Sequence, residues 1–201
     1  MPVEEAQPDT ELAFESEPLG RVVVQGPRCA IRIGKNAMVN APILISGSGC
    51  RVEIGDGCII DGVIRMVRGD GGLIRIGAGT TIVHAALTMH EAGTIMLGAD
   101  CMISSEVHMD VSDMHPIYDR ATGERLNPAE PITLGDHVWV GKRVIVSKGA
   151  SIGSGSVIGA GSIVVGQVPE RVIAVGTPAR VIRENVEWRR DFDEPFLGAA
   201  G

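Results

Sequence analysis

Aliphatic residues recur at every sixth position through most of this chain, and glycine often follows them. Three six-residue units form one group, and the groups begin at Ile33, Ile54, Ile76, Leu97, Leu134 and Ile152. The fifth residue of a unit is usually small or β-branched, as at Ala37, Cys58, Thr80, Cys101, Val138, Ala150 and Ser156. A fixed short period is typical of solenoids, and one large and one small side chain per unit would fill a narrow prism. The pattern predicts an all-β protein, a parallel β-helix of about six coils.

Each of the first three groups carries three or four extra residues at one corner, and the fourth carries a long insertion at residues 115–133. Insertions in repeat proteins gather on a working face, so this loop is expected to be functional rather than a neutral surface insertion. We expect the β-helix over residues 31–168 and a C-terminal cap and tail over 169–201, because an open solenoid end has to be covered. The cap is predicted as a short helix or a hairpin.

The net charge of −7 is concentrated at the N-terminus, where six of the 25 acidic residues stand before position 20 without a base. We interpret residues 1–30 as an acidic flexible arm and lead-in. The remaining 19 acids nearly balance 18 bases, which argues against a nucleic-acid partner. There is no apolar run of membrane-spanning length and no secretory signal pattern. The four cysteines lack metal-type spacing. A cytoplasmic protein is expected.

Two segments carry a specific resemblance. The run GDHVWVGKRVIVSKGASIGSGSVIGAGSIVVGQVPERVIAVGTPARVIR, residues 135–183, and the preceding SDMHPIYD, residues 112–119, resemble the hexapeptide-repeat O-acetyltransferases of the capsule, exopolysaccharide and galactoside/maltose branch. The resemblance implies a left-handed β-helix that forms a homotrimer. It also implies acetyl-CoA as acyl donor, bound between subunits, and a sugar or polysaccharide acceptor.

His115, in the His-Pro pair of the loop, is the predicted catalytic residue. Acetyl transfer from a thioester to a hydroxyl needs a base that is largely neutral near pH 7, and histidine meets that requirement. The acceptor oxygen itself attacks the thioester, so the enzyme needs no nucleophile of its own. A backbone N–H would stabilise the oxyanion.

Equivalent positions of successive coils stack into columns, about 4.8 Å apart. The repeat places His84, Ser105, Lys142 and Ala160 in one such column, with Trp139 nearby, so an extended ligand such as CoA could lie along it. We predict that Trp139 walls the substrate cleft and that His84 contacts the acceptor. His90 and His108 could also line the cleft.

The cofactor-binding residues implied by the resemblance are Lys142, Ala160, Arg180 and Arg183. An arginine fork suits the 3′-phosphate of CoA because it can bind two oxygens. The Thr-Lys pair usual in this branch is Val165-Gly166 here, which removes one basic contact.

Asp113 is the last candidate for the substrate site. It falls in a small slot of the repeat, where an unpaired charge would be costly, so either that corner opens to solvent or Asp113 orients His115. No metal is expected, because the histidines do not reproduce the spacing of the γ-type carbonic anhydrases. A catalytically silent β-helix scaffold remains the alternative from another class.

Overall fold

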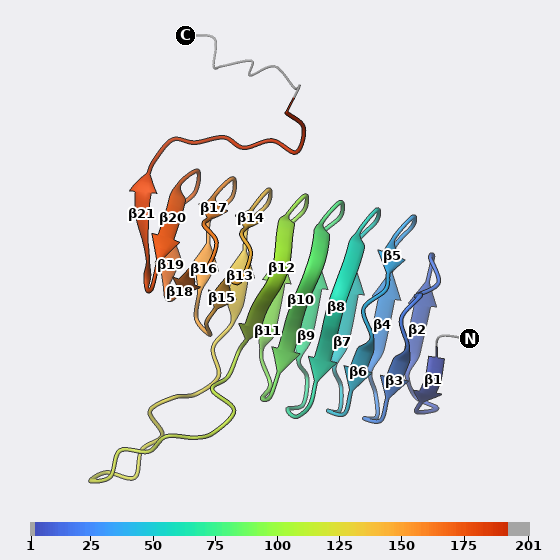
Figure 1. Ribbon diagram of the computed structural model, residues 1–201. Coiled ribbons are helices and arrows are strands. Elements are labelled where there is room, and N and C mark those ends of the chain that lie inside the picture. The colour runs from blue at the N-terminus through green and yellow to red at the C-terminus, as the bar shows by residue number, and fades with distance from the viewer. Residues whose placement is uncertain (1–2, 193–201) are drawn as a thin grey trace.

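The computed structural model describes residues 3–192 and shows strands stacked in parallel along one axis (Figure 1). Eight of them form the sheet of face 1: β2 Glu11–Phe14, β4 Ala30–Ile33, β7 Arg51–Ile54, β9 Leu73–Ile76, β11 Thr94–Leu97, β13 Ile132–Leu134, β16 Ser151–Ile152 and β19 Gln167–Val168. Each strand marks one turn. The fold is a left-handed parallel β-helix, as the repeat and the resemblance predicted. It has about eight turns rather than the predicted six, because the coils begin before residue 31.

A 13-stranded sheet makes the other two sides of the prism. Face 2 contains β5 Met38–Val39, β14 Trp139–Val140, β17 Val157–Ile158 and β20 Ile173–Gly176, and face 3 contains β1 Val3–Ala6, β3 Val22–Val24, β6 Ile43–Ile45, β15 Ile145–Val146 and β18 Ile163–Val164. Three long strands, β8 Ile59–Met66, β10 Thr81–Met89 and β12 Met102–Asp110, run through both faces. We call the corner between faces 1 and 2 corner A, that between faces 2 and 3 corner B, and that between faces 3 and 1 corner C.

The core confirms the two-slot pattern in most coils. Ile33, Ile60 and Val146 fill large slots and are buried, while Cys58 and Ser156 fill small ones with no exposed surface. The small-slot assignment was wrong for Asp113, which is exposed while Val111 is buried in its place. Strand β12 ends at Asp110 and the chain then leaves the coil, so Asp113 falls on the exposed connection to β13. In the coil of β10, a register shift between His84 and Ala85 sets Leu87, rather than Thr88, beside Met109. A bulge of this kind is invisible to a strict period.

The N-terminal segment is not a flexible arm, contrary to the expectation for residues 1–30. Residues 3–24 form β1, β2 and β3, and β2 pairs in register with β4. Its acids face bases of the next coil, as in Glu4–Arg21 at 3.8 Å, Glu11–Arg32 at 3.9 Å and Glu15–Lys35 at 3.6 Å. The charge imbalance therefore belongs to the outer surface of a first coil.

The C-terminal end is capped by a hairpin. Strand β21 Ala179–Arg183 turns back on β20 in antiparallel pairing, which was one of the two predicted forms of the cap. The chain then runs back over the ends of the turns (Figure 1). The part of the predicted tail at 193–201 lies outside the described residues. No helix within residues 3–192 has the length and hydrophobicity needed to cross a lipid bilayer.

Candidate active site

The predicted column of outward positions lies at corner B. His84 pairs with Ser105 in the register of β10 and β12. The amide of Arg143 donates to the carbonyl of Ser105 at 3.0 Å, and the amide of Gly161 donates to that of Lys142 at 2.8 Å. His84, Ser105, Lys142 and Ala160 therefore follow one another along the corner, as the repeat predicted.

Glu106 holds the basic groups of corner B, and sequence reasoning missed it. Its carboxylate pairs with Arg143 Nε at 2.8 Å and with Lys142 Nζ at 2.9 Å. Hydrogen bonds from Arg143 and Lys142 lower the pKa of Glu106 to about 2. The ammonium of Lys142 thus already has a carboxylate partner.

Arg180 and Arg183 lie on β21, which pairs with β20 at the C-terminal end of face 2. Register places Val175 opposite Arg180 and Ile173 opposite Arg183, while Val157 pairs with Ile173 one coil earlier. Both arginine side chains are exposed. Lys142 and Ala160 therefore lie at corner B, whereas Arg180 and Arg183 lie on the hairpin that ends face 2, with Arg183 in the row of Trp139.

Trp139 starts the short strand β14 on face 2. Its neighbours in the column are Met102 in the coil before and Val157 in the coil after. The ring is 38% exposed, which is unusual for the largest apolar side chain and leaves one face available to a ligand.

His115 lies on the long connection between β12 and β13, which covers residues 111–131 rather than the predicted 115–133. The distal part is a hairpin in which the Leu126 amide donates to the Ile117 carbonyl at 2.8 Å. It projects away from corner C (Figure 1). His115 is exposed near the start of this connection, which we call the His115 loop.

Asn127 fixes the backbone at His115. Its amide nitrogen donates to the His115 carbonyl and to the Asp113 carboxylate, both at 2.9 Å. Its side-chain oxygen accepts from the Ile117 amide at 2.6 Å. Asn127 is 7% exposed, so these bonds lie away from water. One side chain therefore joins the two sides of the His115 loop.

The carboxylate of Asp113 bonds to groups other than the imidazole of His115. Lys148 Nζ lies 2.7 Å from its carboxylate and also donates to the Pro128 carbonyl at 3.0 Å. Hydrogen bonds from Lys148 and Asn127 lower the pKa of Asp113. The carboxylate therefore holds the base of the loop, and these contacts do not support a role in orienting His115.

A second anchor joins the loop to the preceding coil. Arg125 forms a two-pronged pair with Glu91, at 2.6 and 2.7 Å, and the Ser112 hydroxyl donates to the same carboxylate at 2.5 Å. Hydrogen bonds from Arg125 and Ser112 lower the pKa of Glu91 to about 2. The ordinary value is 4.5, so this anchor is complete above about pH 4.5 and is lost as the pH falls toward 2.

We expect Glu91→Gln to loosen the His115 loop at neutral pH, because the amide removes the charged partner of Arg125. Amide hydrogen exchange of residues 115–126 should be faster in the variant than in the parent. As the pH falls from about 4.5 toward 2, the parent should approach the variant. Glu124→Gln, at the exposed tip of the same loop, is the control. Equal exchange in parent and Glu91→Gln at pH 7 would show that the pair does not hold the loop.

His115 and Trp139 lie at different corners of one chain. Strand β12 begins beside Trp139, through the pair Met102–Trp139, and ends at Asp110, where the His115 loop leaves. The strand crosses faces 2 and 3 between these points. A site that contains both side chains therefore needs a second copy of the chain.

The other histidines have different surroundings. His90 Nδ1 lies 2.5 Å from the buried carboxylate of Asp110. His108 is half-buried in a shallow pocket at the base of the loop, together with Asp113 and Lys148. His84 is exposed at corner B.

No cluster of three potential metal ligands occurs among residues 3–192. All four cysteines are free and buried, and burial raises the pKa of the Cys101 thiol to about 11. Thiols held in this neutral form are weak metal ligands and nucleophiles. They serve as core residues in the small slots.

Comparisons with known proteins agree with this geometry. The family described as bacterial transferase hexapeptide (six repeats) matches residues 131–166. The polysialic acid O-acetyltransferase of Neisseria meningitidis is 34% identical over 185 residues, covering 88% of this chain and 86% of that protein. Galactoside O-acetyltransferase of Escherichia coli K12 is 42% identical over 100 residues, covering 49% of this chain and 48% of that protein.

A solved structure follows nearly the whole fold. The polysialic acid O-acetyltransferase OatWY superimposes with a TM-score of 0.83 at 27% identity, covering 97% of this chain and 90% of that one. The sequence similarity thus extends well beyond the repeats that any β-helix shares. This chain belongs to the hexapeptide-repeat O-acetyltransferases.

Proposed function

We propose that this protein transfers the acetyl group of acetyl-CoA to a hydroxyl of a sugar polymer, and that the polymer is an acidic one of the polysialic acid type. The observation that carries the proposal is the similarity to a polysialic acid O-acetyltransferase along 88% of the chain. The exposed His115, on a loop anchored at two points, supplies the group that such chemistry needs.

In the proposed reaction, the neutral imidazole of His115 accepts the proton of the acceptor hydroxyl as its oxygen attacks the thioester carbon. The C–O bond forms, the tetrahedral oxyanion collapses, and the C–S bond breaks to release the thiol of CoA. The proton held by the imidazole can then pass to the thiolate. The anchored backbone of the His115 loop supports this role, because a base is effective only when it is held at the reacting hydroxyl.

We further propose that the working unit is a homotrimer, in which the His115 loop of one chain meets the Trp139 face of the next. The separation of the two residues across faces 2 and 3 supports this arrangement. The loop also exposes the apolar side chains of Met114, Ile117, Tyr118 and Leu126, each at least 47% accessible. An apolar projection of this kind is typical of a protein–protein contact.

The donor is proposed to lie along corner B and toward the β20–β21 hairpin, with its phosphates near Arg180 and Arg183. The two exposed guanidinium groups support this placement, because each can bind two phosphate oxygens. Trp139 would form the wall of the cleft on the acceptor side. His84, in the column of corner B, would contact the acceptor. We also propose a cytoplasmic location, which the four free thiols support.

Changing Arg180 and Arg183 together to alanine should raise the KM for acetyl-CoA more than it lowers kcat, because the phosphates are bound alike in the ground and transition states. Loss of each charged hydrogen bond should cost roughly 1.5–3 kcal/mol. Steady-state kinetics with acetyl-CoA and its 3′-dephospho analogue give the measurement. If parent and variant both have equal KM values for the two donors, the arginines serve another purpose.

The direct test of function is release of free thiol from acetyl-CoA with polysialic acid, neutral oligosaccharides or no acceptor present. We expect release that depends on the polymer, and acetyl esters on its hydroxyls by NMR. Thiol release with neutral oligosaccharides but not with polysialic acid would show that the acceptor is a neutral sugar rather than an acidic polymer. The absence of release with every acceptor would favour the scaffold alternative.

A further inference from the structure

The chain after the hairpin runs back along corner A, against the direction in which the coils were built (Figure 1). The amide of Val186 donates to the Arg171 carbonyl at 2.9 Å, Trp188 meets His137, and Arg190 reaches Asp100 and Gly79. We call residues 186–190 the C-terminal clasp. It joins coils that are far apart along the sequence.

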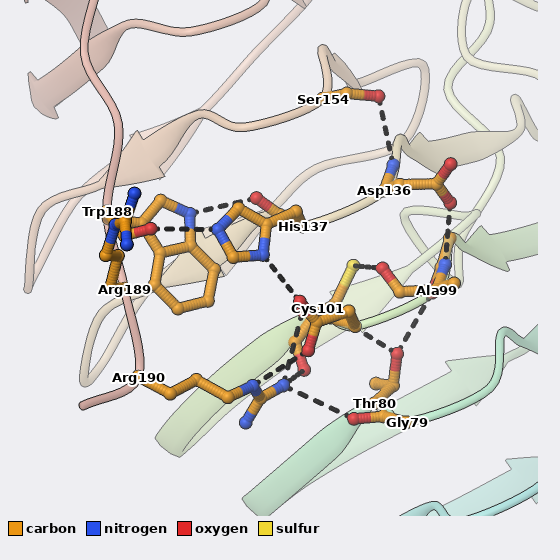
Figure 2. A network of polar contacts seen from close by, with 12 residues as sticks. Gly79, Thr80, Ala99, Cys101, Asp136, His137, Ser154, Trp188, Arg189 and Arg190 are labelled. Carbon is orange, nitrogen blue, oxygen red and sulfur yellow. Dashed lines mark hydrogen bonds and ion pairs between the residues drawn. The ribbon is translucent and has the colours of Figure 1, made fainter. Parts of the chain in front are cut away.

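His137 and Trp188 form the centre of the clasp (Figure 2). The two rings are stacked, with centroids 3.9 Å apart and planes 6° from parallel. The indole N–H donates to the His137 carbonyl and the imidazole Nε2 contacts the Trp188 carbonyl, both at 2.9 Å. Trp188 is only 7% exposed, although it lies in a segment without secondary structure.

The imidazole of His137 faces an acceptor on each side. Nδ1 lies 2.6 Å from the Asp100 carboxylate, and Nε2 faces the Trp188 carbonyl, which can only accept. These two contacts and the stacking on the indole of Trp188 hold the ring of His137 in place and join the clasp to the turn before β14.

Arg190 fixes the far end of the clasp. Nε pairs with Asp100 at 2.8 Å, and the terminal nitrogens donate to the Thr81 hydroxyl at 3.0 Å and to the carbonyls of Gly79, Asp100 and Cys101 at 3.0–3.3 Å (Figure 2). Asp100 thus binds both His137 and Arg190. The guanidinium thus bonds three carbonyls of this corner, of which that of Cys101 also accepts the amide of Thr81 from the coil stack.

The clasp also contacts the proposed active site. The rings of Trp188 and Trp139 lie 6.0 Å apart at an angle of 49°, a favourable tilted arrangement for two aromatic rings. His137 precedes Trp139 by two residues, so the contacts of Trp188 with His137 fix the turn that leads into β14. Trp139 therefore has a backbone held through His137 and a ring held through Trp188.

We propose that the C-terminal clasp is a positioning element for Trp139, with Trp188 as its positioning residue, and that it fixes the indole wall against which the acceptor binds. The proposal rests on the function proposed above, in which Trp139 walls the cleft. Trp139 is 38% exposed, and the ring of Trp188 lies beside its ring. Opening the clasp should therefore weaken acceptor binding and leave the base chemistry in place.

Trp139 and Trp188 are the only tryptophans in the chain, which makes the contact directly measurable. Two indoles this close and inclined should give a coupled circular dichroism signal. The variants are Trp188→Ala, Trp188→Phe and Arg190→Ala, with Glu184→Gln, an exposed residue just before the clasp, as the control. For each variant, the indole signal, the melting temperature, and kcat and KM for polysialic acid and acetyl-CoA are measured.

For Trp188→Ala and Arg190→Ala we expect loss of the coupled signal and a KM for polysialic acid raised by roughly two- to tenfold. Their kcat should change by less than about twofold, since the reacting groups are untouched. Trp188→Phe also loses the indole couplet, but its ring should restore much of the KM. Glu184→Gln should match the parent in every measurement.

A lower melting temperature in Trp188→Ala and Arg190→Ala with an unchanged KM for polysialic acid would overturn the proposal, because the clasp would then only stabilise the fold. Retention of the coupled signal in Arg190→Ala would overturn the anchoring role of Arg190. Trp139→Ala separates these results from failure of the proposed function. If Trp139→Ala leaves the acceptor KM unchanged, Trp139 does not wall the cleft, whatever the clasp variants show.

Discussion

Replacing His115 with alanine should lower kcat by on the order of 10²–10⁴, the usual contribution of a positioned general base. The fold and the binding of CoA should be unchanged, because the His115 side chain is exposed and the loop is held by Glu91, Arg125 and Asn127 instead.

His115→Asn is the matched variant, since it keeps a polar side chain of similar reach without a basic nitrogen. It should be as slow as His115→Ala. Near-parental turnover by either variant with a verified acceptor would show that the base is elsewhere. His84 at corner B and His108 at the base of the loop would then be the next residues to change.

Mixing two defective chains should restore activity. If each site takes His115 from one chain and Trp139 from its neighbour, trimers reassembled from His115→Ala and Trp139→Ala chains will contain some sites with both native side chains. With equal amounts and free exchange, about a quarter of the sites should be native in a ring of three identical interfaces. Thiol release, measured below saturation with polysialic acid, should rise far above that of either variant alone.

The control for this experiment is the same mixture without the denaturation and refolding step that exchanges subunits. It should have only the sum of the two residual activities. A mixture that stays at that sum after exchange, with mixed trimers demonstrated by differently tagged chains, would place His115 and Trp139 of one site in the same chain.

The periodic part of this protein was predictable because a β-helix repeats its environment. Each buried slot returns after six residues, so the positions of Ile60 and Cys58 in the core follow from counting. The same counting placed His84, Lys142 and Ala160 at one corner. It failed at Asp113, because the chain leaves the coil after β12 and places this residue on the exposed connection. It also failed for β1 and β2, whose exposed positions are so acidic that the first coil resembled a tail.

The supports of the site were not predictable by counting. Glu91 and Arg125 are 34 residues apart, and the two partners His137 and Trp188 are 51 apart, in segments that do not repeat. Nothing in the sequence specifies how far the loop or the tail folds back. One weak signal was present: Asn127 precedes a proline, and a buried asparagine at a loop base commonly bonds the backbone.

The first coil has a consequence for how copies of this protein meet. Strands β1 and β2 end their sheets and leave a row of peptide groups without a neighbouring strand, which is a template for end-to-end growth into fibrils. At the opposite end, β21 closes face 2 with an antiparallel strand that no further coil can continue. At the N-terminal end, protection comes from charge: two such ends facing each other would oppose Glu4, Glu5, Glu11 and Glu15 of both copies. The acidic start of the chain thus acts as a gatekeeper that keeps a stackable fold at finite length.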